Sequence, residues 1–132
     1  MTRYLDLAEY FWLAEQVTGI DAETLGSVSR SDLADSALHA PAAGFGDDDF
    51  YPDVFDKAAV LACRLAWNHP LPDGNKRASW AALVLFIDLN DGTWQPDPPV
   101  VDDAEQAMLA VAAREVDEAW LASWLRARVR FG

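Results

Sequence analysis

The chain has 132 residues, a length that suits one domain able to bury a hydrophobic core. Hydrophobic residues make up 52% of it, which favours a folded protein over a disordered one. The formal net charge of −12, with only ten Lys and Arg residues, argues against a protein whose main task is to bind nucleic acid.

The first part of the chain predicts two helices and a flexible segment. Apolar residues at helical spacing, among them Ala8 and Trp12, predict a helix over about residues 5–17. A second, short helix begins near Ser31, whose hydroxyl can cap it. Residues 40–51 contain one Pro, two Gly and three Asp, and this composition predicts a loop or a small hairpin flap.

Two strongly apolar helices are predicted in the middle of the chain. One runs from Asp53 to about Asn68, with Pro52 as a first helical residue, and the other covers Ala78 to Leu89. Helices that are hydrophobic on almost every side belong in the centre of a bundle. The segment that joins them is therefore expected to be a turn held rigidly from both sides.

The last part of the chain predicts two more helices. Gly92 and three following prolines interrupt the chain after the second apolar helix. Asp102 with Glu105 then resembles a capping box, although Asp replaces the usual Ser or Thr. A final helix covers about residues 117–128. The sequence therefore predicts an all-α fold with at most a short β-hairpin in the flap.

The cysteine content and the length of the apolar runs indicate in which cellular compartment the protein works. Cys63 is the only cysteine, so no internal disulfide can form, and we interpret it as a core residue in a reducing cytoplasm. The longest apolar run, Trp80 to Ile87, is far shorter than the roughly 18 residues of a membrane span. We expect one cytoplasmic domain over residues 1–132, with no secretory signal, no membrane partner and no direct nucleic-acid partner.

The segment between the two apolar helices carries the most evident chemistry. It reads His69-Pro70-Leu71-Pro72-Asp73-Gly74-Asn75-Lys76-Arg77. The first turn of a helix has free N–H groups and a partial positive charge, so it binds anions, and Lys76 and Arg77 add two cations there. Asp73 suits a hard divalent cation shared with phosphates, and His69 can act as a general base near neutral pH. The arrangement favours phosphate-transfer chemistry.

Each of these residues also fits a structural role when it is taken alone. His69 could cap the preceding helix, and Lys76 and Arg77 could be solvated charges at a helix start. A base, a metal-type carboxylate, an anion-binding turn and two cations within nine residues favour a functional site over these separate roles. The run Asp47–Asp49 lies in the flexible segment, and we interpret it as solvated rather than as a metal site.

The nine-residue segment resembles the H-x-F-x-[DN]-[AG]-N-K-R motif of the death-on-curing (Doc) toxins, a branch of the Fic fold. The likeness extends across nearly the whole chain and includes Phe45–Gly46, Tyr51–Ala59 and Phe86–Asn90. The resemblance implies a Fic-type core of about six helices, with a catalytic loop between two central helices and a short flap hairpin.

The same resemblance implies a bacterial toxin that transfers the γ-phosphate of ATP to a Thr or Ser hydroxyl of a protein, elongation factor Tu, and so inhibits translation. The base would take the proton from the target hydroxyl, the carboxylate would hold Mg²⁺, and the following turn would bind the phosphates. The implied catalytic residues are His69, Lys76 and Arg77; the residues implied for ATP and Mg²⁺ are Asp73, Gly74, Asn75, Lys76 and Arg77, with Asp73 as the metal ligand.

Two positions depart from the family's pattern. Leu71 stands where Doc toxins usually have Phe, and it keeps the role of a hydrophobic anchor under the loop. Lys76 stands where the wider Fic family, which transfers AMP, has a second Gly that lets the backbone approach the nucleotide. The Lys favours kinase chemistry. Protein AMP transfer is the alternative, and a non-catalytic binding protein that kept the fold is a second alternative.

The sequence also bears on regulation. Many Fic proteins restrain themselves with an [ST]-x-x-x-E-[GN] helix whose Glu competes for the motif Arg. No Glu of this chain is followed by Gly or Asn. We therefore expect inhibition by a separate chain, a Phd-like antitoxin that folds as a helix into an apolar groove.

Overall fold

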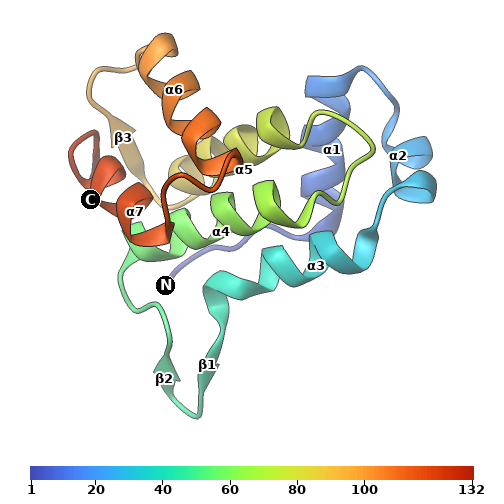
Figure 1. The fold of residues 1–132 in the computed structure, drawn as a ribbon. Helices are drawn as coiled ribbons and strands as arrows, with labels where there is room; N and C mark the ends of the chain where they lie inside the picture. The colour runs from blue at the N-terminus through green and yellow to red at the C-terminus, as the bar shows by residue number, and fades with distance from the viewer.

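The computed structural model describes residues 1–132 and arranges them around two central helices, α4 (Val54–Asn68) and α5 (Asn75–Leu89) (Figure 1). The remaining helices are α1 (Leu7–Thr18), α2 (Ala22–Val28), α3 (Ser31–His39), α6 (Val101–Ala112) and α7 (Glu118–Arg126), with a 3-10 turn at Ala40–Ala42. Two antiparallel strand pairs complete the fold: β1 (Gly44–Phe45) with β2 (Asp48–Asp49), and β3 (Gly92–Trp94) with β4 (Val129–Phe131). The all-α prediction is confirmed, with seven α-helices rather than about six. None of these helices is both long and apolar enough to cross a membrane.

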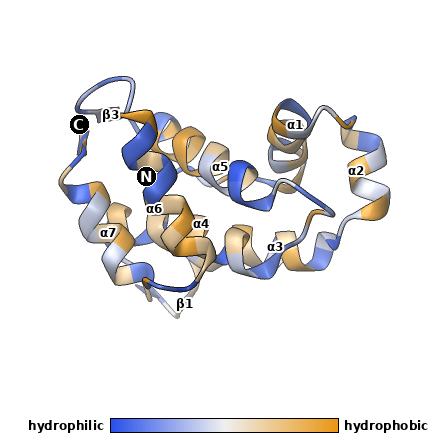
Figure 2. Cartoon of the chain, turned by 45° about the horizontal axis from the view of Figure 1, so that its top comes forward, coloured by the Kyte–Doolittle hydropathy of each residue, from blue (hydrophilic) through white to orange (hydrophobic).

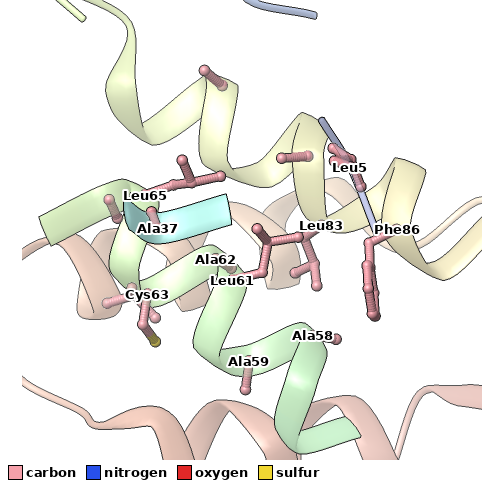
Figure 3. Packing of buried hydrophobic residues seen from close by; sticks show 14 of the residues in the cluster. Leu5, Ala37, Ala58, Ala59, Leu61, Ala62, Cys63, Leu65, Leu83 and Phe86 are labelled. Carbon is pink, nitrogen blue, oxygen red and sulfur yellow. The ribbon is translucent and has the colours of Figure 1, made fainter. Parts of the chain in front are cut away.

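Helix α4 lies at the centre because its side chains are apolar around most of its surface. It packs against α3, α5, α6 and α7, and Figure 2 shows mostly hydrophobic colours along it. Leu61 of α4 lies beside Leu83 of α5 within a cluster of 31 buried residues that joins most of the helices (Figure 3). Cys63 is fully buried in the same cluster, and burial raises the pKa of its thiol to about 12. Its interpretation as a core residue is confirmed.

The starts of α1 and α4 and the cap of α3 differ from the sequence prediction. Helix α1 begins after Asp6, whose carboxylate accepts the Glu9 N–H at 2.8 Å in a reciprocal capping box. Helix α4 is capped by Asp53, so Pro52 precedes the helix instead of lying in its first turn. Ser31 is the first residue of α3 and makes no capping hydrogen bond. Competing carboxylate caps and backbone geometry therefore decide these boundaries.

The face that α1 buries was predicted wrongly. Of the predicted face of Leu5, Ala8 and Trp12, only Leu5 is buried, and it precedes the helix; Ala8 is exposed, and Trp12 is 57% exposed. A larger apolar face on another side of the helix packs into the core instead, because it offers two aromatic rings and a leucine. The buried residues of α1 are Tyr10, Phe11, Leu13 and Ala14.

Some short elements were missed or placed wrongly. The flap hairpin is confirmed as β1–β2, but the second strand pair, β3–β4, and helix α2 were not expected. Strands of three residues carry little periodicity, and β4 reaches β3 from the far end of the chain. The capping box is also wrong: Val100 is the cap position of α6, so Asp102 and Glu105 lie inside the helix. The final helix ends at Arg126 rather than near residue 128.

The flap is fastened to the core by Lys57, a side chain of α4 that is only 2% exposed. Its Nζ donates to the Pro41 carbonyl oxygen at 3.1 Å and to Asp49 Oδ2 at 3.0 Å. A buried ammonium needs such partners. Asp47, Asp48 and Asp49 are all exposed as expected, and Asp49 in addition forms an ion pair with Lys57. No cluster of three metal-type side chains forms there or elsewhere.

We expect Asp49→Ala to lower the free energy of unfolding by about 2 kcal/mol, because the buried charge of Lys57 would lose its only counterion and keep just the Pro41 carbonyl oxygen and the Tyr4 ring as partners. Asp48→Ala changes a neighbouring exposed carboxylate and should alter the free energy by less than about 0.5 kcal/mol. Denaturant unfolding of both variants measures the difference. Equal stability of Asp49→Ala and the wild type would contradict the role given to this ion pair.

Candidate functional site

The loop between α4 and α5 begins at His69, whose backbone has the left-handed conformation (φ 48°, ψ 55°). This conformation costs a residue other than glycine roughly 1–2 kcal/mol. It turns the chain out of α4 and leaves the imidazole exposed. The next two residues, Pro70 and Leu71, are buried, so the base of the loop is anchored in the protein. Leu71 is 4% exposed and fills the expected anchor position.

Two hydrogen bonds with the start of α3 hold the residues on either side of His69, one through the Asn68 side chain and one through the Pro70 backbone. Asn68 Nδ2 donates to the Leu33 carbonyl oxygen at 3.0 Å. The Arg30 N–H donates to the Pro70 carbonyl oxygen at 2.7 Å. Because the residues before and after His69 are both fixed, the strained backbone of His69 is supported by its surroundings.

The side chain of Asn75 closes the loop from within. Its Oδ1 accepts the Leu71 N–H at 2.9 Å, and its Nδ2 donates to the Leu71 carbonyl oxygen at 2.9 Å. The same Nδ2 lies 3.4 Å from Nδ1 of His69. The amide side chain of Asn75 is thus engaged in shaping the loop beside the imidazole. The group that Asn75 can offer an anion is its backbone N–H.

The first turn of α5 has donors that the protein itself does not use. The helix begins at Asn75, three residues before the predicted Ala78, and its first internal bond joins the Ala78 N–H to the Gly74 carbonyl oxygen at 2.9 Å. No side chain caps this end, and the N–H groups of residues 75–77 make no hydrogen bond within the protein. Neither Lys76 nor Arg77 takes part in any of the seven ion pairs. This end of α5 is therefore ready to bind an anion.

Gly74 joins the loop to α5 at a position that favours glycine. Its φ is 79°, and a Cβ atom there would lie 2.9 Å from Cγ2 of Thr18 at the end of α1. The absence of a side chain lets the loop pack closely against α1. Gly74 therefore sets where the first turn of α5 lies.

A cavity of about 1070 Å³ opens above this turn, and all six site residues expected from the sequence line it: His69, Asp73, Gly74, Asn75, Lys76 and Arg77. Pro72 joins them at the same end of the cavity. The other walls come from the end of α1, from α5, from α6 and from the segment before α6. Their lining residues are Val17, Trp80, Ala81, Val84, Pro98, Pro99, Val101, Ala104, Glu105 and Met108.

Sequence reasoning missed these other walls. On α5 the lining residues after Arg77 follow helical spacing, at 80, 81 and 84, and those of α6 do so at 101, 104, 105 and 108. The spacing is visible in the sequence, but it does not tell which helix each face meets. The face of α6 therefore looks like an ordinary core face until the fold is known.

Asp73 fits a divalent cation that arrives together with phosphate. Its side chain is exposed at the end of the cavity that the first turn of α5 lines. Because no three metal-type side chains gather in the protein, a cation here would take one carboxylate from the chain and its other ligands from phosphate oxygens and water. Mg²⁺ is commonly bound in this way.

The chain is similar in sequence to known proteins over most of its length. Residues 4–87, which include the whole loop, match the Fic/DOC family. A protein named Toxin Doc from Mycolicibacterium smegmatis is 38% identical to this chain over 117 residues, which are 89% of this chain and 86% of that protein. No solved structure matches the chain.

We expect Gly74→Ala to lower the free energy of unfolding by about 1–2 kcal/mol, because the new Cβ meets Thr18 and the backbone keeps a positive φ. Gly26→Ala is the matched control, since Gly26 lies in α2 with nothing near its Cβ position. That change should stabilise the protein by up to about 1 kcal/mol. Denaturant unfolding of both variants measures these changes in the free energy of unfolding, which should have opposite signs. A Gly74→Ala protein as stable as the wild type would contradict the preference for glycine at this position.

Proposed function

The chain belongs to the Fic/DOC family, and from this premise we propose that it is a Doc-like toxin that transfers the γ-phosphate of ATP to a hydroxyl of a protein target. The observation that carries the proposal is the cavity in which His69 stands beside the unsatisfied first turn of α5. Phosphoryl transfer depends mainly on positioning and on neutralising spread negative charge. The positioning and the positive charge would come from the free N–H groups of the first turn together with Lys76 and Arg77.

Each residue of the loop has a role in this proposal. His69 is exposed and lies against the amide of Asn75, so it can accept the proton of a hydroxyl that approaches from solvent. Lys76, Arg77 and the N–H groups of the first turn bind phosphate oxygens and stabilise the charge on the transferred group. Asp73 would hold Mg²⁺, which supplies charge neutralisation when bound.

Particular residues argue against the two alternatives, AMP transfer and a non-catalytic binding protein. Lys76 places a side chain on the cavity wall where a Gly would leave the backbone open to the nucleotide, which weighs against AMP transfer. His69 and Asp73 both line the cavity, and a protein that only binds has no need of a base there. We therefore favour the kinase over both the AMP transferase and the non-catalytic binding protein.

The proposed partners follow from family membership and from the sequence. We take elongation factor Tu as the target and inhibition of translation as the consequence, as the resemblance of the loop implies. A Phd-like antitoxin from a separate chain is the proposed inhibitor. The absence of a self-inhibiting Glu motif supports it, as does the name of the relative from Mycolicibacterium smegmatis. These interactions would take place in the cytoplasm.

We expect His69→Ala to reduce transfer of γ-label to the target by about a hundredfold or more, since the general base is removed. His39→Ala is the matched control, because His39 is the other histidine and lies exposed at the end of α3, bonded to the Asp35 carbonyl oxygen at 2.8 Å. The measurement incubates each protein with Mg²⁺, elongation factor Tu and separately α- and γ-labelled ATP. Full activity in a folded His69→Ala protein would remove the base assignment, and α-label on the target would favour AMP transfer.

We expect Lys76→Gly to lower γ-label transfer about tenfold or more, because a charge-assisted contact to the phosphates is lost. The open backbone should also allow some α-label to reach the target. The same labelled assay measures both. Undiminished γ-transfer by Lys76→Gly would leave the kinase reaction standing but would contradict the role given to this side chain.

A further inference from the structure

The cavity contains one charged side chain that the phosphate chemistry does not use, Glu105 of α6. Apart from Asp73 it is the only carboxylate among the lining residues, and it is exposed to the cavity and to solvent. It takes part in none of the protein's ion pairs, with Lys76 or Arg77 or any other cation. Its carboxylate is therefore free to accept hydrogen bonds from a ligand.

The position of Glu105 follows from the way α6 is fastened. Trp67 Nε1, two residues before His69, donates to the Val111 carbonyl oxygen at 2.7 Å. The C-terminal end of α6 is therefore held near the loop, and Met108 and then Glu105 lie farther from it, at about 1.5 Å per residue. Glu105 therefore lies roughly 9 Å along the axis of α6 from Val111, the residue that Trp67 holds.

Charge sets the direction in which a nucleotide would lie. The triphosphate is attracted to the first turn of α5, with Lys76 and Arg77, and it is repelled by Glu105. The ribose adjoins the phosphates, and its two hydroxyls are donors that a carboxylate accepts strongly. The remaining walls, which include Trp80, Val84 and Met108, are apolar and suit the faces of a base.

We propose that Glu105 binds the 2′- and 3′-hydroxyls of the nucleotide ribose and makes the protein selective for ribonucleotides. The inference rests on the proposed function, because it requires a nucleotide in this cavity. It adds a specificity residue that lies outside the loop motif, on a helix that the motif does not include.

The test measures the affinity of Mg–ATP and of Mg–2′,3′-dideoxy-ATP by calorimetry, for the wild type and for Glu105→Ala. We expect the wild type to bind ATP about tenfold more tightly than the dideoxy nucleotide. Glu105→Ala should bind the two nucleotides within about twofold of each other, because its affinity for ATP falls and that for the analogue does not. Asp102→Ala is the matched control: it removes an exposed carboxylate from the same helix that does not line the cavity, and it should keep the preference of the wild type.

The outcomes separate this inference from the proposed function. Equal binding of both nucleotides by the wild type would overturn the role of Glu105 while leaving nucleotide binding intact. Retention of the preference in Glu105→Ala would overturn it too, as would an equal loss in Asp102→Ala, which would indicate a general effect of charge. A wild type that binds neither nucleotide would refute the proposed function itself.

Discussion

The structure depends on one constraint: the first turn of α5 must keep its N–H groups free. The starts of α1, α2, α4 and α7 are each capped by an aspartate side chain, whereas those of α3 and α6, like that of α5, have no side-chain cap. At α5 the cap position is Gly74, which has no side chain to offer, and the amide of Asn75 is drawn back onto Leu71. The N–H groups have no partner within the protein because each nearby group that could accept from them is absent or engaged elsewhere.

The rigidity of this site comes from outside the motif. The loop joins the two helices at the centre of the core, and the start of α3 holds the residues on both sides of His69. Gly74 rests against Thr18 at the end of α1. A charge-stabilising site works when its dipoles are already oriented, so packing that fixes the loop is part of the proposed chemistry.

The acidic character of the chain and its anion site are compatible because they act over different distances. The net charge of −12 is a property of the whole surface, and salt screens it beyond about 8 Å. The N–H groups of the first turn, Lys76 and Arg77 act at contact distance. Glu105, farther along the same cavity, adds a repulsive element that favours one direction for an anionic ligand.

Much of this arrangement could be predicted from the sequence, and the limits have physical reasons. The nine-residue loop and the two apolar helices are local patterns, so the all-α core and the grouping of His69 with Asp73 and the cations followed from them. The turn of the Asn75 amide back onto Leu71 depends on loop geometry that no periodicity encodes. The cavity walls of α6, including Glu105, depend on which helices meet in space, and the strand pair at Thr93 joins distant parts of the chain.

The central claim is that the first turn of α5 binds the phosphates of a nucleotide. The most direct measurement follows the backbone amide signals of ¹⁵N-labelled protein by NMR as Mg–ATP is added. The account predicts that the amides of Asn75, Lys76 and Arg77 shift most, together with the imidazole signals of His69. Saturable binding that leaves these amides unmoved, or no response at millimolar nucleotide, would contradict it.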